Sequence, residues 1–186
     1  MTESDMESDE TLFAAWRRGE GNKLEELVRR FEEPLFRFLF RRSGDAARAE
    51  DLFQETWMSV LKGRDTYDPS RSFKTWLYSI ALNASRKSWR EKPPMPLDPA
   101  DLSRPVPGDS PTRTLERRET AAAVQRILAA LPDAQRDVFL LCEYEGLTYP
   151  EIAAVLERPV GTVKSQMFYA VRRVKSALED LWEDLK

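Results

Sequence analysis

Residues 131–178 carry the clearest structural signal in the chain and read LPDAQRDVFLLCEYEGLTYPEIAAVLERPVGTVKSQMFYAVRRVKSAL. Thr148 stands directly before Tyr149 and Pro150, and a threonine cap with a proline in the first turn is typical of a helix start. Apolar residues then recur at helical spacing, stop over residues 157–159, and resume. The stretch therefore predicts two helices and then a tight helix-turn-helix.

The longer helix of the predicted motif has one apolar face and one polar, basic face. Between residues 158 and 178 there are five Lys or Arg and no Asp or Glu. A recognition helix needs small polar side chains near base edges and cations near phosphates, so this face favours DNA binding. A solvated face on an ordinary helical bundle gives the same spacing and remains the alternative. The residues expected to be buried are Ile152, Ala153 and Leu156 in the shorter helix, and Val160, Val163, Met167, Ala170, Val171, Val174 and Leu178 in the longer one.

A family resemblance is carried by Leu131, Pro132, Gln135, Arg136, Gly146, Glu151–Ala153, Pro159–Ser165 and Ala170. Together these residues resemble the carboxy-terminal domain of bacterial sigma-70 family initiation factors. The compact length is similar to that of the extracytoplasmic-function (ECF) subgroup, which keeps two of the family's domains. The resemblance implies an all-α fold, with two small helical domains joined by a Pro-rich linker and a helix-turn-helix in the second. It also implies that contacts to the minus-35 promoter element come from Thr162, Lys164, Ser165, Gln166, Phe168, Tyr169 and Arg172.

Three positions depart from the family pattern in this motif. The family commonly has arginine at the positions of Gln166 and Tyr169, and glycine at the position of Glu157. The loss of two cations is expected to weaken phosphate contact and to lower the salt dependence of DNA binding.

The amino-terminal half is expected to hold the other domain, residues 10–92, after an acidic disordered tail at residues 1–9. Its helix at residues 46–62 resembles the one by which the family binds core RNA polymerase. The resemblance implies that Asp51, Gln54 and Glu55 make the polar contacts, whereas Leu52 and Trp57 belong to the core. An ordinary amphipathic helix is the alternative.

Residues 63–75 have the composition of a loop, and a helix is expected from Trp76 to about Arg90. Aromatic and basic residues alternate here, a combination that suits single-stranded nucleic acid. In the resembled family this segment recognises and opens the minus-10 element and holds a flipped base.

Phe73 and Trp76 are expected to be largely buried. The predicted minus-10 contacts are Arg64, Tyr67, Arg71, Lys74, Asn83, Arg86 and Lys87. The segment departs from the family pattern at Ser85, Lys87 and Ser88, so the promoter sequence is left open.

Residues 93–118 are predicted to be a linker, because seven prolines fall between positions 93 and 111. In the resembled family such a linker threads through the polymerase, and a plain spacer fits the residues equally well. The second domain is then residues 119–186.

The amino-acid composition and the charge distribution exclude several kinds of site and location. The chain has 186 residues and a net charge of -3, with -5 on residues 1–10 and +5 on residues 11–92. It has no histidine and one cysteine, so no metal site, disulfide or cofactor is expected. Neither a membrane-spanning stretch nor a signal-peptide pattern is present, which predicts a cytoplasmic protein without membrane insertion.

The leading hypothesis is a non-enzymatic initiation factor whose partners are core RNA polymerase and promoter DNA. The resemblance further implies an anti-sigma factor as a partner. A helix-turn-helix regulator that never joins polymerase is the alternative, although such a regulator does not require the helix at residues 46–62 or the aromatic loop. An enzyme is disfavoured, because neither a phosphate-binding glycine loop nor a recognisable pair of catalytic carboxylates is present.

Overall fold

The computed structural model describes residues 7–91 and 115–184, and every regular element within these ranges is a helix. The predicted all-α fold is therefore confirmed. Most of the predicted tail (residues 1–9) and of the predicted linker (93–118) lies outside the described residues. In chain order the elements are α1 (Asp9–Arg17), α2 (Asn22–Ser43), α3 (Ala46–Lys62), the 3-10 turn η2 (Arg64–Thr66), α4 (Phe73–Glu91), α5 (Leu115–Ala130), α6 (Asp133–Glu143), α7 (Tyr149–Leu156) and α8 (Val160–Asp184).

The long helix α2 continues through Pro34. Pro34 is exposed, so the loss of one helical hydrogen bond falls on the solvent side of the helix. The helix ends at Gly44, whose φ of 74° is a left-handed conformation that glycine adopts without strain. Asp45 then caps α3 by accepting a hydrogen bond of 3.1 Å from the backbone N–H of Arg48.

Helix α4 begins at Phe73, earlier than the predicted start at Trp76. Two side chains satisfy its first N–H groups: the Ser72 hydroxyl accepts from Thr75 N at 3.1 Å, and the Glu10 carboxylate accepts from Phe73 N at 2.9 Å. The second cap comes from α1 and has no local sequence signature. It therefore explains why the predicted loop was too long.

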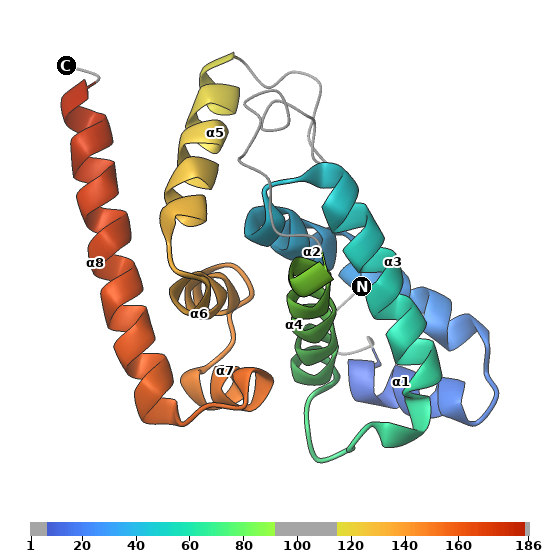
Figure 1. Ribbon diagram of the computed structural model, residues 1–186. Helices are drawn as coiled ribbons and strands as arrows, with labels where there is room; N and C mark the ends of the chain where they lie inside the picture. Colours follow the sequence, from blue (N-terminus) through green and yellow to red (C-terminus); the bar gives the residue numbers. More distant parts are fainter. Residues whose placement is uncertain (1–6, 92–114, 185–186) are drawn as a thin grey trace.

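The carboxy-terminal group of helices comprises α5 to α8, with α7 and α8 forming the tight helix-turn-helix (Figure 1). Within residues 131–178 only α6 precedes this motif, because α5 ends at Ala130. The prediction of two helices before the motif in that stretch was therefore wrong by one helix.

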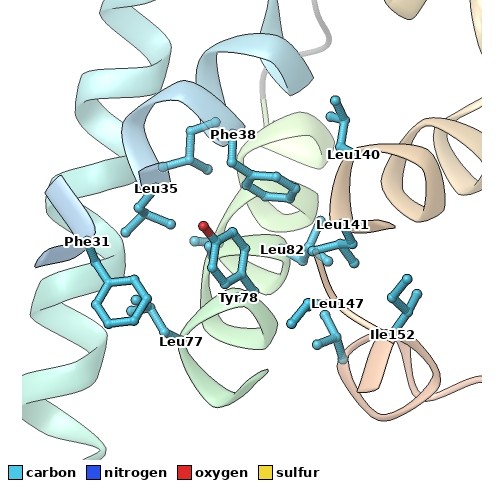
Figure 2. Close-up of a cluster of buried hydrophobic side chains, with 14 of the residues drawn as sticks. Phe31, Leu35, Phe38, Leu77, Tyr78, Leu82, Leu140, Leu141, Leu147 and Ile152 are labelled. Atoms are coloured by element: carbon cyan, nitrogen blue, oxygen red, sulfur yellow. The ribbon is translucent and has the colours of Figure 1, made fainter. Parts of the chain in front are cut away.

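A single apolar core joins the two halves of the chain. Helix α4 packs on α7, and α2 packs on both α5 and α6. Figure 2 shows Phe38, Tyr78 and Leu82 from the first half facing Leu141 and Ile152 from the second. All five side chains are fully buried. The two predicted domains thus share one core in this structure, which the sequence did not predict.

Three residues of the predicted α8 stripe are exposed instead of buried. Val160, Val171 and Leu178 are 36%, 45% and 45% exposed. Helix α8 has 25 residues and is longer than α6 and α7, on which it packs, which accounts for Leu178 near its far end. Val160 is instead the first residue of the helix, and Val171 lies beside the buried Ala170 but points away from the core. The prediction holds for Val163, Met167 and Ala170, which are buried, and in part for Val174, which is half-buried.

Candidate nucleic-acid interface

The helix-turn-helix is fixed at its start by a capping box. The Thr148 side chain accepts a hydrogen bond from the backbone N–H of Glu151, whose carboxylate accepts from the backbone N–H of Thr148 at 2.8 Å. The Thr148 hydroxyl also donates to the Glu151 carboxylate at 2.6 Å. This bond and the one from the Thr148 backbone N–H lower the pKa of Glu151 below its ordinary value. The predicted helix start at Thr148, Tyr149 and Pro150 is confirmed.

The turn between α7 and α8 is strained at one residue. Glu157 caps the end of α7 with φ 53° and ψ 47°, the left-handed conformation that side chains with a Cβ atom adopt at a cost. Among the described residues it is the one non-glycine residue with positive φ. The tight turn therefore requires this conformation although the chain has no glycine there.

The outward face of α8 presents the predicted minus-35 residues to solvent. Phe168 and Tyr169 are 58% and 51% exposed and pack edge to face, and the Arg172 guanidinium lies 5.6 Å from the Phe168 ring centre. At the start of the helix Gly161 leaves open space where a side chain would project. Another molecule can therefore come close to this face, which exposes cations and aromatic rings. Thr162, Lys164, Ser165 and Arg172 are exposed as well, and Gln166 is half-buried.

The predicted minus-10 residue Tyr67 has a structural role in this structure. Its side chain is 5% exposed and packs among Phe13, Phe73 and Trp76, and its hydroxyl donates a hydrogen bond of 2.6 Å to the carbonyl of Arg71. Burial raises the pKa of Tyr67 to about 12. The ring holds the loop in place and offers no free face for stacking, which corrects the prediction of a direct contact. Of the two rings expected to be largely buried, Phe73 is fully buried and Trp76 is half-buried.

Four predicted minus-10 residues lie at the surface of the first half: Arg64, Arg71, Asn83 and Lys87. Arg71 lies 3.9 Å from Asp68, a contact weak enough to leave the guanidinium available. Asp68 also accepts a hydrogen bond of 2.9 Å from the backbone of Ser70, which shapes the loop tip. The loop is therefore formed, with its cations outward.

The remaining two predicted minus-10 cations face the second half of the chain. The Lys74 ammonium donates a hydrogen bond to the backbone carbonyl of Glu145. The Arg86 guanidinium lies 3.9 Å from the carboxylate of Asp137. Neither contact was predicted from the sequence.

The predicted polymerase-binding residues lie on α3. Asp51 and Gln54 are exposed, whereas Glu55 is half-buried and lies 3.4 Å from Lys87. The expected core residues of this helix, Leu52 and Trp57, are buried. The same helix exposes Met58 (51%) and Leu61 (41%), two apolar side chains that the sequence interpretation did not single out as contacts. Exposed apolar residues beside polar ones are typical of a protein-binding face.

Within the described ranges, no helix is long and apolar enough to cross a membrane. In the same ranges no cluster of His, Cys, Asp or Glu side chains is suited to hold a metal ion.

Comparison with known proteins identifies both halves of the chain. The model of the family described as Sigma-70 region 2 matches residues 27–93, and that of Sigma-70, region 4 matches residues 121–174. The RNA polymerase sigma-H factor of Pseudomonas aeruginosa is 31% identical, over 94% of this chain and 96% of its own length. The ECF RNA polymerase sigma factor SigW of Bacillus subtilis is 27% identical, over 89% of this chain and 94% of its own.

Solved structures show the same arrangement of helices. CnrH, in complex with the cytosolic domain of CnrY, aligns with a TM-score of 0.73 and 25% identity over 94% of this chain and 99% of its own. The sigma factor RpoE from Bartonella quintana, in complex with the anti-sigma factor NepR, aligns with a TM-score of 0.65 and 23% identity over 84% of this chain and 96% of its own. The first alignment spans both halves of the chain.

Proposed function

Because the chain belongs to the sigma-70 family, and to its extracytoplasmic-function group, we propose that it is a transcription initiation factor that binds core RNA polymerase and directs it to promoters. The observation that carries this function is the presence of regions 2 and 4, in that order, in a chain 31% identical to a sigma factor over 94% of its length. Such a factor is not an enzyme. It works in the cytoplasm, where the polymerase and the chromosome are.

Region 4, here residues 119–186, reads the minus-35 element through the outward face of α8. Support comes from its exposed cations and rings, and from the open approach at Gly161. Lys164 and Arg172 meet phosphates, and Ser165 and Phe168 meet base edges. With Gln166 and Tyr169 in place of the arginines common in the family, fewer phosphates are neutralised.

Region 2, residues 10–92, reads and opens the minus-10 element with the loop after α3 and the surface of α4. Support comes from the exposed side chains Arg64, Arg71, Asn83 and Lys87 on one formed loop and helix. Opening a duplex costs a few kcal/mol per unstacked base, and contacts with the exposed strand offset this cost.

Helix α3 binds core RNA polymerase with Asp51 and Gln54, and with Glu55 after its contact to Lys87 is released. The exposed Met58 and Leu61 supply the apolar part of the same surface. An anti-sigma factor is a further partner, since a solved sigma factor with the same fold is described in complex with an anti-sigma factor.

The test is co-elution of the chain with core RNA polymerase that lacks any sigma factor. The double variant Asp51→Ala and Gln54→Ala is expected to lower the retained fraction. The matched control is Glu20→Ala and Glu25→Ala, which removes two exposed acidic residues away from α3. Retention of the wild type and the control, with loss of the double variant, supports the proposal. If the wild type does not associate at low salt, the proposal fails, and a helix-turn-helix regulator that acts without polymerase becomes the leading hypothesis.

A further inference from the structure

The second half of α8 carries an apolar face that the other described helices leave uncovered, and Figure 1 shows this helix at the edge of the molecule. Nine large apolar side chains are exposed among the described residues, and six of them belong to α8: Val160, Phe168, Tyr169, Val171, Leu178 and Trp182. Trp182 is the most exposed of them, at 68%. A group of exposed apolar residues that includes a large aromatic ring is typical of a protein-binding surface.

Four residues of this face form a continuous stripe, which we call the α8 seam: Val171, Val174, Leu178 and Trp182. They follow one another at steps of three or four residues, so they lie on the same side of the helix. Together with Phe139 on α6 they line a groove of about 630 Å³. Val174 and Phe139 are half-buried and connect the seam to the core. The groove therefore has room for side chains of a partner helix.

Charge is divided between the two ends of the seam. Three cations flank its first half and three carboxylates flank its second half: Arg172, Arg173 and Lys175, then Glu179, Asp180 and Glu183. All six side chains are exposed. Lys175 lies 3.8 Å from Glu179, but an exposed pair of this kind contributes little and is easily exchanged. A matching helix has to place acidic residues beside the first half and basic residues beside the second.

A second copy of α8 that runs in the opposite direction has this charge distribution. Its acidic end lies beside the cations of the first copy, and its cations lie beside the acidic end of the first, so each contact occurs twice. A parallel copy would instead bring like charges together, which is costly. The segment between α4 and α5 is not suited to supply a matching helix, because seven prolines fall between positions 93 and 111.

We propose that the chain forms an antiparallel dimer through the α8 seam, with Trp182 of each copy seated in the groove beside Phe139 and Val171 of the other. When Val171 faces Trp182 of the second copy, Lys175 faces Leu178 and Arg172 lies within reach of Glu179. An aromatic ring in an apolar groove is a common centre of binding energy. The contact is small, near the lower limit of about 1,000 Å² for specific interfaces, so the dimer is weak.

The test is sedimentation velocity of the full chain over a range of concentrations. The sedimentation coefficient of the wild type is expected to rise from the monomer to the dimer value, with a midpoint of about 10–100 µM. Trp182→Ala removes an exposed ring and is expected to weaken association by roughly tenfold or more. Val160→Ala is the matched control, because it truncates another exposed apolar residue of the same helix outside the seam, and it is expected to associate like the wild type.

Charge reversal tests the pairing of opposite ends. Glu179→Lys with Glu183→Lys makes both halves of the seam basic, and Arg172→Glu with Arg173→Glu leaves both halves with mainly acidic flanks. Neither double variant is therefore expected to associate with itself. An equal mixture of the two is expected to form the dimer again, because each acidic end then meets a basic one. Recovery in the mixture also shows that both variants are folded.

The control for net charge is Glu25→Lys with Glu32→Lys, which makes the same charge change at two exposed residues of α2 and is expected to leave association unchanged. A wild type that stays monomeric up to about 300 µM overturns the proposal. So does a dimer that Trp182→Ala leaves intact, or a pair of charge variants that does not recover on mixing. None of these measurements involves polymerase, so failure of the proposed function shows separately, as absent co-elution with core RNA polymerase.

Discussion

The hydroxyl of Tyr78 on α4 donates a hydrogen bond to the carboxylate of Glu145, which follows α6, inside the contact between regions 2 and 4. Tyr78 is fully buried and Glu145 is 6% exposed. Burial raises the pKa of Glu145 above its ordinary 4.5, although the Tyr78 hydroxyl and the nearby charges of Lys74 and Arg41 act in the opposite direction. Burial also raises the pKa of Tyr78, so its hydroxyl remains a donor.

The raised pKa of Glu145 predicts a pH dependence. Above pH 4.5 and up to its raised pKa, the folded chain binds more protons at this residue than the unfolded chain, so its contribution to stability falls as pH rises. Below pH 4.5 the contribution is complete. Glu145→Gln is expected to remove this pH-dependent contribution. The unfolding free energy of the variant minus that of the wild type should therefore increase from pH 4.5 to pH 8. Urea titrations at several pH values measure this difference. A difference that stays constant would show that Glu145 titrates normally in the folded chain.

Removing the cap of α7 is expected to destabilise the helix-turn-helix. Thr148→Ala deletes the acceptor for the Glu151 N–H and should lower the unfolding free energy by about 1 kcal/mol. Thr148→Ser keeps the hydroxyl and should retain most of the stability. Chemical denaturation of the three proteins provides the comparison, and equal losses for both variants would point to packing of the threonine methyl group instead.

Relief of strain at the turn is expected to stabilise the chain. Glu157→Gly removes a left-handed cost of about 1–2 kcal/mol and adds unfolded-state entropy of about 0.4–1 kcal/mol. The net gain should therefore be roughly 0.5–1 kcal/mol. Glu157→Ala keeps the Cβ atom and serves as the control, with little expected change. Thermal melts distinguish the two, and a gain for alanine as large as for glycine would exclude backbone strain as the cause.

A phosphate contact by Lys164 predicts a change in the salt dependence of promoter binding. Lys164→Ala in the assembled holoenzyme should weaken binding on all sequences, and should reduce the slope of log K against log salt by about 0.9. Ser165→Ala should instead alter the base preference within the minus-35 element, with the slope retained. Filter binding at four salt concentrations gives the slopes, and an unchanged slope for Lys164→Ala would place this lysine away from the phosphates.

The hydroxyl of Tyr67 is expected to stabilise the loop after α3. Tyr67→Phe keeps the buried ring and removes the bond to the Arg71 carbonyl, for a loss of about 1 kcal/mol. Because Arg71 is on the proposed minus-10 surface, DNA opening should slow in parallel. Permanganate reactivity of unpaired thymines reports the opening. Slower opening with unchanged stability would mean that the hydroxyl contacts DNA directly.

Local signals explain what was predicted well from the sequence. Helix α3 has the predicted bounds, residues 46–62, because a cap, an apolar stripe and a following glycine all lie within one short stretch. The start of α7 was predictable for the same reason, since Thr148 and Glu151 are three residues apart. The family resemblance was also evident, because the residues that carry it all lie within residues 131–170.

Contacts between distant residues explain what was missed. Arg42 and Asp137 are 95 residues apart, and each is a charged residue that sequence patterns assign to the surface. Their mutual burial follows only from the docking of the two regions. The role of Tyr67 was missed for a similar reason: an aromatic in a basic loop looks the same whether its ring packs inward or faces solvent.

Because the two halves of the chain share one core, neither half is suited to be studied as a separate fragment. Cutting the chain between α4 and α5 would leave Phe38 and Leu82 on one fragment, and Leu141 and Ile152 on the other, without their apolar neighbours. Each fragment would then expose apolar surface that is buried in the whole chain, and would self-associate in concentrated solution. Separate domains are therefore poor substitutes for the whole polypeptide in crystallisation or binding assays.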